Sequence, residues 1–140
     1  MTIRDLLTHM SGLTYDFMYR TNVDAAYRKT KVQQAESLKD FVDILSKLPL
    51  EFSPGDKWNY SVSTDVLGYL VEVLSGMELE DYFKKYIFTP LEMNDTSFSC
   101  PKNKLDRLCS LYEHDPVGIP KLLEIPFLNT RMASGGGGLF

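Results

Sequence analysis

The sequence contains few of the residues from which metal sites, disulfide frameworks and membrane spans are built. It has two cysteines, Cys100 and Cys109, and two histidines, His9 and His114, with no metal-type spacing among them. No apolar run approaches the roughly 18 residues of a membrane span, and residues 1–9 contain no signal-peptide core. We therefore expect no metal, no cofactor and no membrane span. Pairing of the cysteines stays open, and a cytoplasmic location is the default expectation.

An excess of basic residues is also missing. The 140 residues include 15 Lys and Arg against 19 Asp and Glu, a net charge of −4. Proteins that bind the phosphate backbone of nucleic acids need clustered positive charge, so a nucleic-acid partner is excluded. With 44% hydrophobic and 24% charged residues, the composition is typical of one globular domain.

The common motifs for nucleophiles and phosphate binding are absent or uninformative. No Gly-x-Ser-x-Gly occurs, and no Lys-Ser or Lys-Thr follows the glycines at 135–138, which excludes a P-loop. Ser99 and Lys102 match Ser-x-x-Lys, but chance alone predicts about 0.8 such matches in a chain of this composition. We interpret Ser99 as part of a surface turn, and the glycine run as a tight turn against packed structure.

Other polar and aromatic candidates have ordinary structural explanations. His9 and Ser11 could form a Ser/His pair, but a third orienting group cannot be identified from spacing. We expect both side chains to hydrogen-bond the backbone at a helix end. Trp58 and Tyr60 flank a turn, where an aromatic pair usually belongs to the core, so Tyr60 is only a candidate on residue chemistry alone.

Capping residues and apolar periodicity predict several helices. Thr2 with Asp5 resembles a capping box and starts a short helix that Gly12 would stop. A second capping box at Ser37 precedes apolar residues spaced for a helix that ends before Pro49. Residues 13–35 read as a loop with a possible helical turn at 24–29.

The second half of the chain is expected to contain further helices and short strands. Ser63 would cap a helix that ends at Gly76, and residues 78–87 would form another before Pro90. Residues 96–98 and 107–112 could be short strands, and residues 113–130 read as irregular. Ser53–Asp56 is predicted to form a turn.

Four pieces of sequence occur in a fixed order along the chain. They are Thr2–Leu13; Phe52–Ser61 followed by Asp65–Glu72 and Ser75-Gly76; Ile87–Met93 followed by Thr96 and Phe98; and Ser134–Leu139. Together they resemble the β-lactamase-related serine hydrolases, the group of class C β-lactamases, D,D-peptidases and penicillin-binding-protein-like esterases. The resemblance implies an α+β, mostly helical chain with only short strands. It would correspond to the helical lobe of the β-lactamase/transpeptidase-like fold, residues 1–140 forming a single partial domain.

The resemblance assigns one catalytic residue. Tyr60 matches the first residue of the family's Tyr-x-Asn motif, whose phenol lies beside the nucleophile and relays its proton. The third position is Val62, where β-lactamases and peptidases carry Asn, so the sequence is more similar to the esterase members. The family's Ser-x-x-Lys nucleophile lies upstream of the segment that matches Thr2–His9, and further sheet strands lie downstream of the glycines. Because neither stretch is present here, we expect the isolated chain to be inactive.

Two classes of function remain open. The first is a segment of a serine hydrolase that forms an acyl-enzyme with a small ester, or, as a variant, with an amide or lactam. The second is a non-catalytic binding module derived from the same fold. The face with Val66, Leu70 and Leu74 should be partly exposed, so the isolated chain is expected to self-associate.

Overall fold

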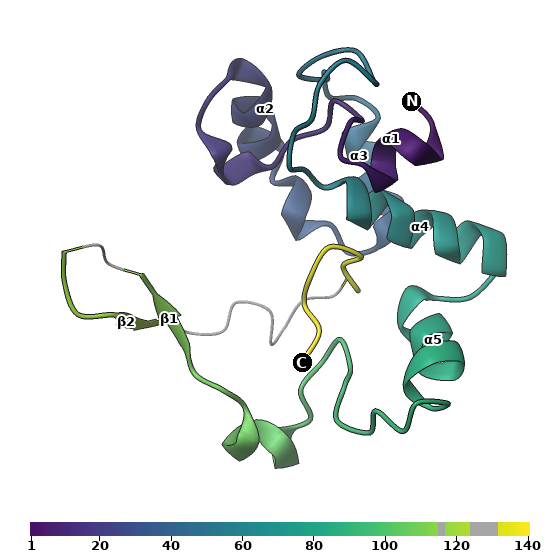
Figure 1. Cartoon of the computed structure of the whole chain (residues 1–140), viewed down its shortest axis with the longest axis vertical. Helices are drawn as coiled ribbons and strands as arrows, with labels where there is room; N and C mark the ends of the chain where they lie inside the picture. Colours follow the sequence, from purple (N-terminus) through teal and green to yellow (C-terminus); the bar gives the residue numbers. More distant parts are fainter. Residues whose placement is uncertain (115–116, 124–131) are drawn as a thin grey trace.

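The computed structural model describes residues 1–114, 117–123 and 132–140. Helices α1 (Ile3–Leu7), α2 (Asn22–Thr30), α3 (Leu38–Leu45) and α4 (Ser63–Ser75) form the main body, and α5 (Leu79–Phe83) lies below α4 in Figure 1. Strands β1 (Leu111–Glu113) and β2 (Lys121–Leu123) pair antiparallel, with Leu111 opposite Leu123. This hairpin lies apart from the helices (Figure 1). The prediction of a mostly helical α+β chain with only short strands is confirmed.

Helix α1 begins as predicted but ends early. Thr2 Oγ1 accepts a hydrogen bond from the Asp5 amide at 3.2 Å, and the Asp5 carboxylate accepts one from the Thr2 amide at 2.6 Å. The helix ends at Leu7, and the expectation that Gly12 stops it is wrong. His9 turns the chain instead, because it adopts a left-handed φ of 55°.

Gly12 has a different structural role, which is to allow two segments to approach each other. A Cβ atom there would lie 2.3 Å from the carbonyl oxygen of Phe52. The Gly12 carbonyl accepts from the Glu51 amide at 2.8 Å, and the Met10 carbonyl accepts from the Gly55 amide at 2.8 Å. Residues 9–12 therefore run beside residues 51–59, including the turn predicted at Ser53–Asp56, where Gly55 has a φ of 94°.

The expectation of a loop over residues 13–35 is wrong, although its predicted helical turn lies inside α2. Thr21 and Asp24 form a capping box at the start of this helix. Asp24 is fully buried, but its carboxylate accepts hydrogen bonds from the backbone amides of Arg20 and Thr21 and from the Arg28 guanidinium. The sequence pattern is weak here because a polar residue occupies a buried position of the helix.

Helices α3 and α4 carry much of the core. Ser37 caps α3 as predicted, and Leu38, Phe41 and Leu45 are buried on one face. Helix α4 begins at Ser63, so its N-cap is Val62 and not Ser63, and it ends at Gly76 as predicted. The core combines residues from both ends of the chain, including Leu6, Leu13, Tyr27, Val32, Phe41, Val62, Leu79, Phe98 and Met132.

The far end of α4 leaves the core. Leu74 is 77% exposed, and Val66 and Leu70 are half-buried. The predicted partial exposure of this face is therefore confirmed. No helix within the described residues is long and apolar enough to cross a bilayer.

The region after α5 differs from the expectation in its local structure. Helix α5 continues into a π-helical turn at Lys84–Phe88, and residues 102–107 form a 3-10 helix. Residues 96–98 are not a strand, although Ser97 and Phe140 exchange two backbone hydrogen bonds of 2.9 and 3.2 Å. The strand expected at 107–112 begins only at Leu111, and β2 lies within the stretch expected to be irregular. Residues 115–116 and 124–130 of that stretch lie outside the described residues.

Candidate active site around Tyr60

Tyr60 lies in a segment whose side chains alternate between solvent and interior. Trp58 and Tyr60 are 66% and 46% exposed, whereas Asn59 is 8% exposed and Ser61 is fully buried. The expectation that Trp58 and Tyr60 form a core pair is wrong, because the intervening polar residues take the interior positions. The phenol of Tyr60 thus lies at the surface, and the residues before and after it are buried.

Asn59 is held from three directions. The backbone amide of Asn59 donates a hydrogen bond to the His9 carbonyl at 2.9 Å. Its side-chain Nδ2 donates to the Leu13 carbonyl at 2.8 Å, and its Oδ1 accepts from Arg20 Nη2 at 2.7 Å. A buried amide whose donor and acceptor are both satisfied fixes the local backbone, so the residue before Tyr60 is firmly anchored.

Ser61, the residue after Tyr60, belongs to a chain of buried hydroxyls. Ser61 Oγ lies 3.2 Å from His9 Nδ1 and 2.8 Å from Ser63 Oγ. Ser63 Oγ lies 2.7 Å from Ser11 Oγ, which accepts from the Leu13 amide at 3.2 Å. We refer to His9, Ser61, Ser63 and Ser11 as the serine chain.

The serine chain corrects part of the sequence interpretation. Ser11 does bond the backbone, as expected, but the His9 side chain bonds Ser61 and not a backbone group. Ser11 and His9 therefore do not form a Ser/His pair. They are linked only through Ser61 and Ser63, whose hydroxyls could not be associated with them from spacing.

Aromatic rings flank Tyr60 on two sides. The ring centroids of His9 and Tyr15 lie 5.2 and 5.1 Å from that of Tyr60. Burial raises the pKa of Tyr15 well above its ordinary value, and the charges of Asp65 and Tyr60 add to this effect. Tyr15 consequently stays a neutral phenol near Tyr60. Sequence reasoning missed it, because residues 13–35 showed no clear pattern.

The glycine run packs against the start of α4. A Cβ atom on Gly135 would lie 2.2 Å from the Thr64 carbonyl oxygen, and one on Gly136 would lie 3.3 Å from the Tyr15 hydroxyl. Gly138 has a φ of 81°. The predicted tight turn against packed structure is confirmed, and it brings the end of the chain close to Tyr15.

A buried carboxylate anchors this glycine turn. Asp65 is 2% exposed, and its Oδ1 accepts hydrogen bonds from Ser134 Oγ at 2.5 Å and from the Gly136 amide at 3.3 Å. Burial raises the pKa of Asp65, and the two hydrogen bonds oppose this shift. In the sequence Asp65 stands out only as part of a motif, because its partner 69 residues away gives no local signal.

The other candidates lie elsewhere. Ser99 is exposed in a bend, and Lys102 begins the 3-10 helix, which fits the interpretation of Ser99 as part of a surface turn. Cys100 and Cys109 are both free thiols. Within the described residues, no three His, Cys, Asp or Glu side chains gather as a metal site would require.

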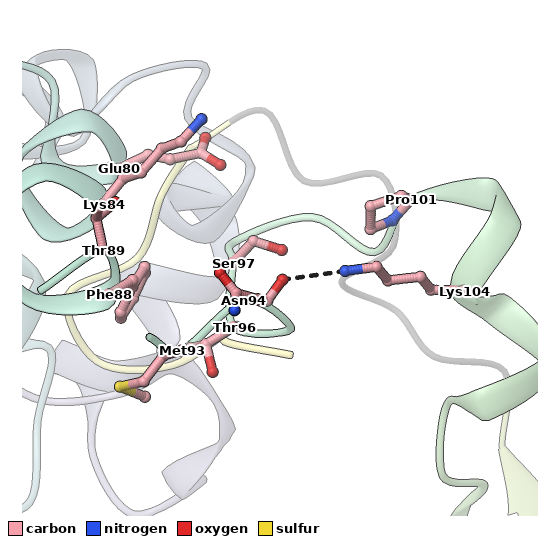
Figure 2. A pocket seen from close by; sticks show the side chains of 10 residues that line it. All are labelled: Glu80, Lys84, Phe88, Thr89, Met93, Asn94, Thr96, Ser97, Pro101 and Lys104. Carbon is pink, nitrogen blue, oxygen red and sulfur yellow. Dashed lines mark hydrogen bonds between the residues drawn. The ribbon is translucent and has the colours of Figure 1, made fainter. Parts of the chain in front are cut away.

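A pocket of about 250 Å³ lies between the end of α5 and residues 93–104. Figure 2 shows Phe88 and Met93 on one side and Lys104 on the other, with Lys104 Nζ donating to the Asn94 carbonyl at 3.0 Å. Residues 80–104 supply all of its lining. The pocket therefore does not include Tyr60 or the serine chain.

Comparison with known protein families identifies the group to which this arrangement belongs. The family model described as Beta-lactamase matches residues 1–140. The chain belongs to the beta-lactamase family. This is a family of serine hydrolases that includes esterases as well as β-lactamases.

Individual relatives agree with this assignment. Lovastatin esterase from Penicillium rubens is 33% identical over 151 residues, covering 100% of this chain and 36% of that protein. Among solved structures, simvastatin synthase LovD from Aspergillus terreus, a LovD6 mutant, is 28% identical with a TM-score of 0.77, covering 99% of this chain and 32% of that one. EstCE1, a hydrolase with promiscuous acyltransferase activity, has a TM-score of 0.80 at 24% identity, covering 99% of this chain and 42% of that one, and shows the shared fold.

The chain spans about a third or less of the length of the curated relatives it matches, for example 35% of a Mycobacterium tuberculosis protein and 36% of lovastatin esterase. These family members place the helical body of Figure 1 within the β-lactamase-like fold.

Proposed function

We propose that this chain is a segment of an esterase-type serine hydrolase, in which Tyr60 relays the proton of an acyl-transfer reaction on small esters. The observation that supports this role is the presentation of Tyr60. Its phenol is 46% exposed, whereas both neighbouring residues are buried and hydrogen-bonded. A group that moves a proton must be open to the reacting atoms and fixed in place, and Tyr60 meets both conditions.

The proposed reaction has two halves. A serine hydroxyl attacks the ester carbonyl, its proton passes through Tyr60 to the departing alcohol, and the acyl group remains on the serine. Water then attacks the acyl-enzyme, and its proton returns through Tyr60 to the serine as the acid leaves. We propose that the serine and an adjacent lysine come from a Ser-x-x-Lys segment outside these 140 residues. Residues 1–140 alone are accordingly expected to be inactive.

An ester is favoured over a lactam or peptide by Val62. In the β-lactamases and peptidases that the sequence resembles, an Asn at this position hydrogen-bonds the amide of the substrate. Val62 is fully buried in the core and caps α4, so its side chain offers no hydrogen bond to a substrate. The name of lovastatin esterase points to ester chemistry in one relative as well.

The alternative of a non-catalytic binding module draws its support from the exposed end of α4. Leu74 and Val73 are 77% and 59% exposed, and an apolar patch of this kind promotes association. We propose that it makes the isolated chain self-associate. The open, anchored position of Tyr60 is not explained by a binding module, so we favour the hydrolase.

The experiment that tests the proposed substrate class compares two chromogenic substrates on the complete enzyme that contains this chain. We expect kcat/KM for a short p-nitrophenyl ester to exceed that for nitrocefin by at least about 100-fold, the discrimination that a missing substrate hydrogen bond can produce. Faster turnover of nitrocefin by the unmodified enzyme would contradict an esterase.

A further inference from the structure

His9 contacts both neighbours of Tyr60 in the sequence. Its carbonyl oxygen accepts from the Asn59 amide at 2.9 Å, and its Nδ1 lies 3.2 Å from Ser61 Oγ. One residue of the loop after α1 thus holds the backbone before Tyr60 and the side chain after it. The two contacts lie on either side of Tyr60 in the sequence.

The backbone of His9 makes this double contact possible. His9 has a φ of 55°, in the left-handed region that residues other than glycine rarely adopt. This conformation lets the carbonyl and the imidazole both face residues 59–61. Asparagine tolerates the same conformation, which makes it a suitable replacement in experiments.

The partner of the imidazole is itself fixed. Ser61, Ser63 and Ser11 are each fully buried, and their hydroxyls lie 2.7 to 2.8 Å apart in series. A hydroxyl that is constrained from its far side cannot rotate freely, so Ser61 Oγ gives Nδ1 a rigid partner. The orientation of the imidazole is determined through the serine chain.

The imidazole ring also limits where the Tyr60 ring can go. The two centroids are 5.2 Å apart with an interplanar angle of 48°, and Trp58 contacts His9 with its centroid 6.2 Å away. Tyr15 contacts the Tyr60 ring as well, with centroids 5.1 Å apart. Because Tyr60 is 46% exposed, the rest of its side chain faces solvent, which provides no restraint on its rotamer.

We infer that His9 is a positioning residue for Tyr60, whose Nδ1 contact with Ser61 holds the phenol in a single orientation. The importance of that orientation for catalysis rests on the proposed function of Tyr60. The contact itself concerns only residues of this chain, so it can be tested separately from catalysis.

The test uses the 140-residue chain with 13C,15N-labelled tyrosine and measures the Hα–Hβ couplings of Tyr60 by NMR. Unequal couplings, which report one χ1 rotamer, are expected in the unmodified chain. His9→Gly removes the imidazole without backbone strain, and the couplings should converge to averaged values. His9→Asn keeps a polar atom near the position of Nδ1, and the couplings should stay unequal.

The hydrogen bond from the backbone amide of Asn59 to the His9 carbonyl does not depend on the His9 side chain. The NMR signal of this amide therefore serves as the internal control that the backbone contact is intact in each variant. If the Tyr60 couplings stay unchanged in His9→Gly, or if His9→Asn averages them as fully as His9→Gly does, the inference is overturned. Should His9→Gly fail to fold, Ser61→Ala decides the question, since it removes the partner of Nδ1 and leaves His9 intact. Unchanged couplings in that variant would also overturn the inference.

Kinetics on the complete enzyme separate this inference from the proposed function. His9→Gly should lower kcat for a p-nitrophenyl ester by about tenfold or more with little change in KM, and His9→Asn should recover most of the loss. Averaged couplings with full activity would contradict the catalytic role of Tyr60 while leaving its positioning by His9 intact. Unchanged couplings would overturn the positioning whatever the activity.

Discussion

Two regions of the molecule are stabilised in opposite ways. Around Tyr60, residues 9–20 and 59–63 are joined by hydrogen bonds of buried and half-buried side chains, whose partners lie 39 to 52 positions apart in sequence. From residue 94 to the hairpin, the ion pairs are local and exposed. Asp95 pairs with Lys104 at 2.6 Å and Arg107 at 2.7 Å, only 9 and 12 residues away.

The two regions also differ in how strongly salt and pH affect their interactions. Hydrogen bonds and charge from Arg107 and Lys104 lower the pKa of Asp95 to about 2. Exposed pairs of this kind contribute little to stability and are weakened by salt. The β1 strand is exposed at every position, so it adds little apolar burial.

This difference affects the stability of the segment that carries Tyr60. Interior hydrogen bonds cost much when broken, so the segment that carries Tyr60 should open only with global unfolding. Residues held by exposed ion pairs should open locally at much lower free energy. The proton-relaying role that we propose for Tyr60 requires a fixed side chain, which the first kind of region provides.

The largest expected effect on stability is at Gly135, where the end of the chain meets α4. Gly135→Ala would place Cβ 2.2 Å from the Thr64 carbonyl oxygen, a backbone atom that cannot move aside easily. We expect the free energy of unfolding to fall by about 2 kcal/mol, as for other overpacking substitutions.

Urea denaturation of the 140-residue chain measures this loss, and Gly137→Ala is the matched control. A Cβ at Gly137 would have no other atom within 4 Å, so the control should match the unmodified chain. Equal midpoints for the two variants would show that the glycine turn is not docked on α4.

A smaller effect is expected at Asp65, whose carboxylate is buried against the glycine turn. Because burial raises its pKa in the folded chain, folding disfavours the ionised form. Its contribution to stability is complete below the unfolded-state pKa and is lost as pH rises through the folded-state pKa. Asp65→Asn cannot ionise, so the stability of the unmodified chain relative to this variant should fall as the pH rises above the ordinary carboxyl pKa of about 4.

Urea denaturation at several pH values checks the sign of this change. Asp56→Asn, at an exposed turn position, is the control for the loss of one carboxylate. A gain in stability of the unmodified chain over Asp65→Asn with rising pH would contradict the raised pKa. It would mean that the hydrogen bonds from Ser134 and Gly136 outweigh burial.

Local sequence signals predicted the parts of the fold that depend on neighbouring residues. Thr2 and Ser37 cap their helices through backbone amides three residues away, and Gly76 terminates its own helix. Helix α2 was missed because buried Asp24 interrupts its apolar face, and its burial depends on amides and a guanidinium around it.

The candidate site also combines features that local sequence predicts with features that depend on distant contacts. The resemblance of residues 52–61 to a known motif led to Tyr60, but residue chemistry wrongly placed Trp58 and Tyr60 in the core. Tyr15, the serine chain and the bond between Asp65 and Ser134 depend on contacts across 45 or more positions, for which one sequence has no signal.

Proton transfer through the Tyr60 hydroxyl in an esterase reaction is tested most directly by Tyr60→Phe in the complete enzyme. The substitution removes one hydroxyl and almost no volume from a half-exposed ring. We predict that kcat for a p-nitrophenyl ester falls by about 100-fold or more while the unfolding midpoint stays unchanged. Tyr112→Phe, at a 56% exposed position on β1, should keep full activity. Equal kcat values for Tyr60→Phe and Tyr112→Phe would contradict a proton-relaying role for Tyr60.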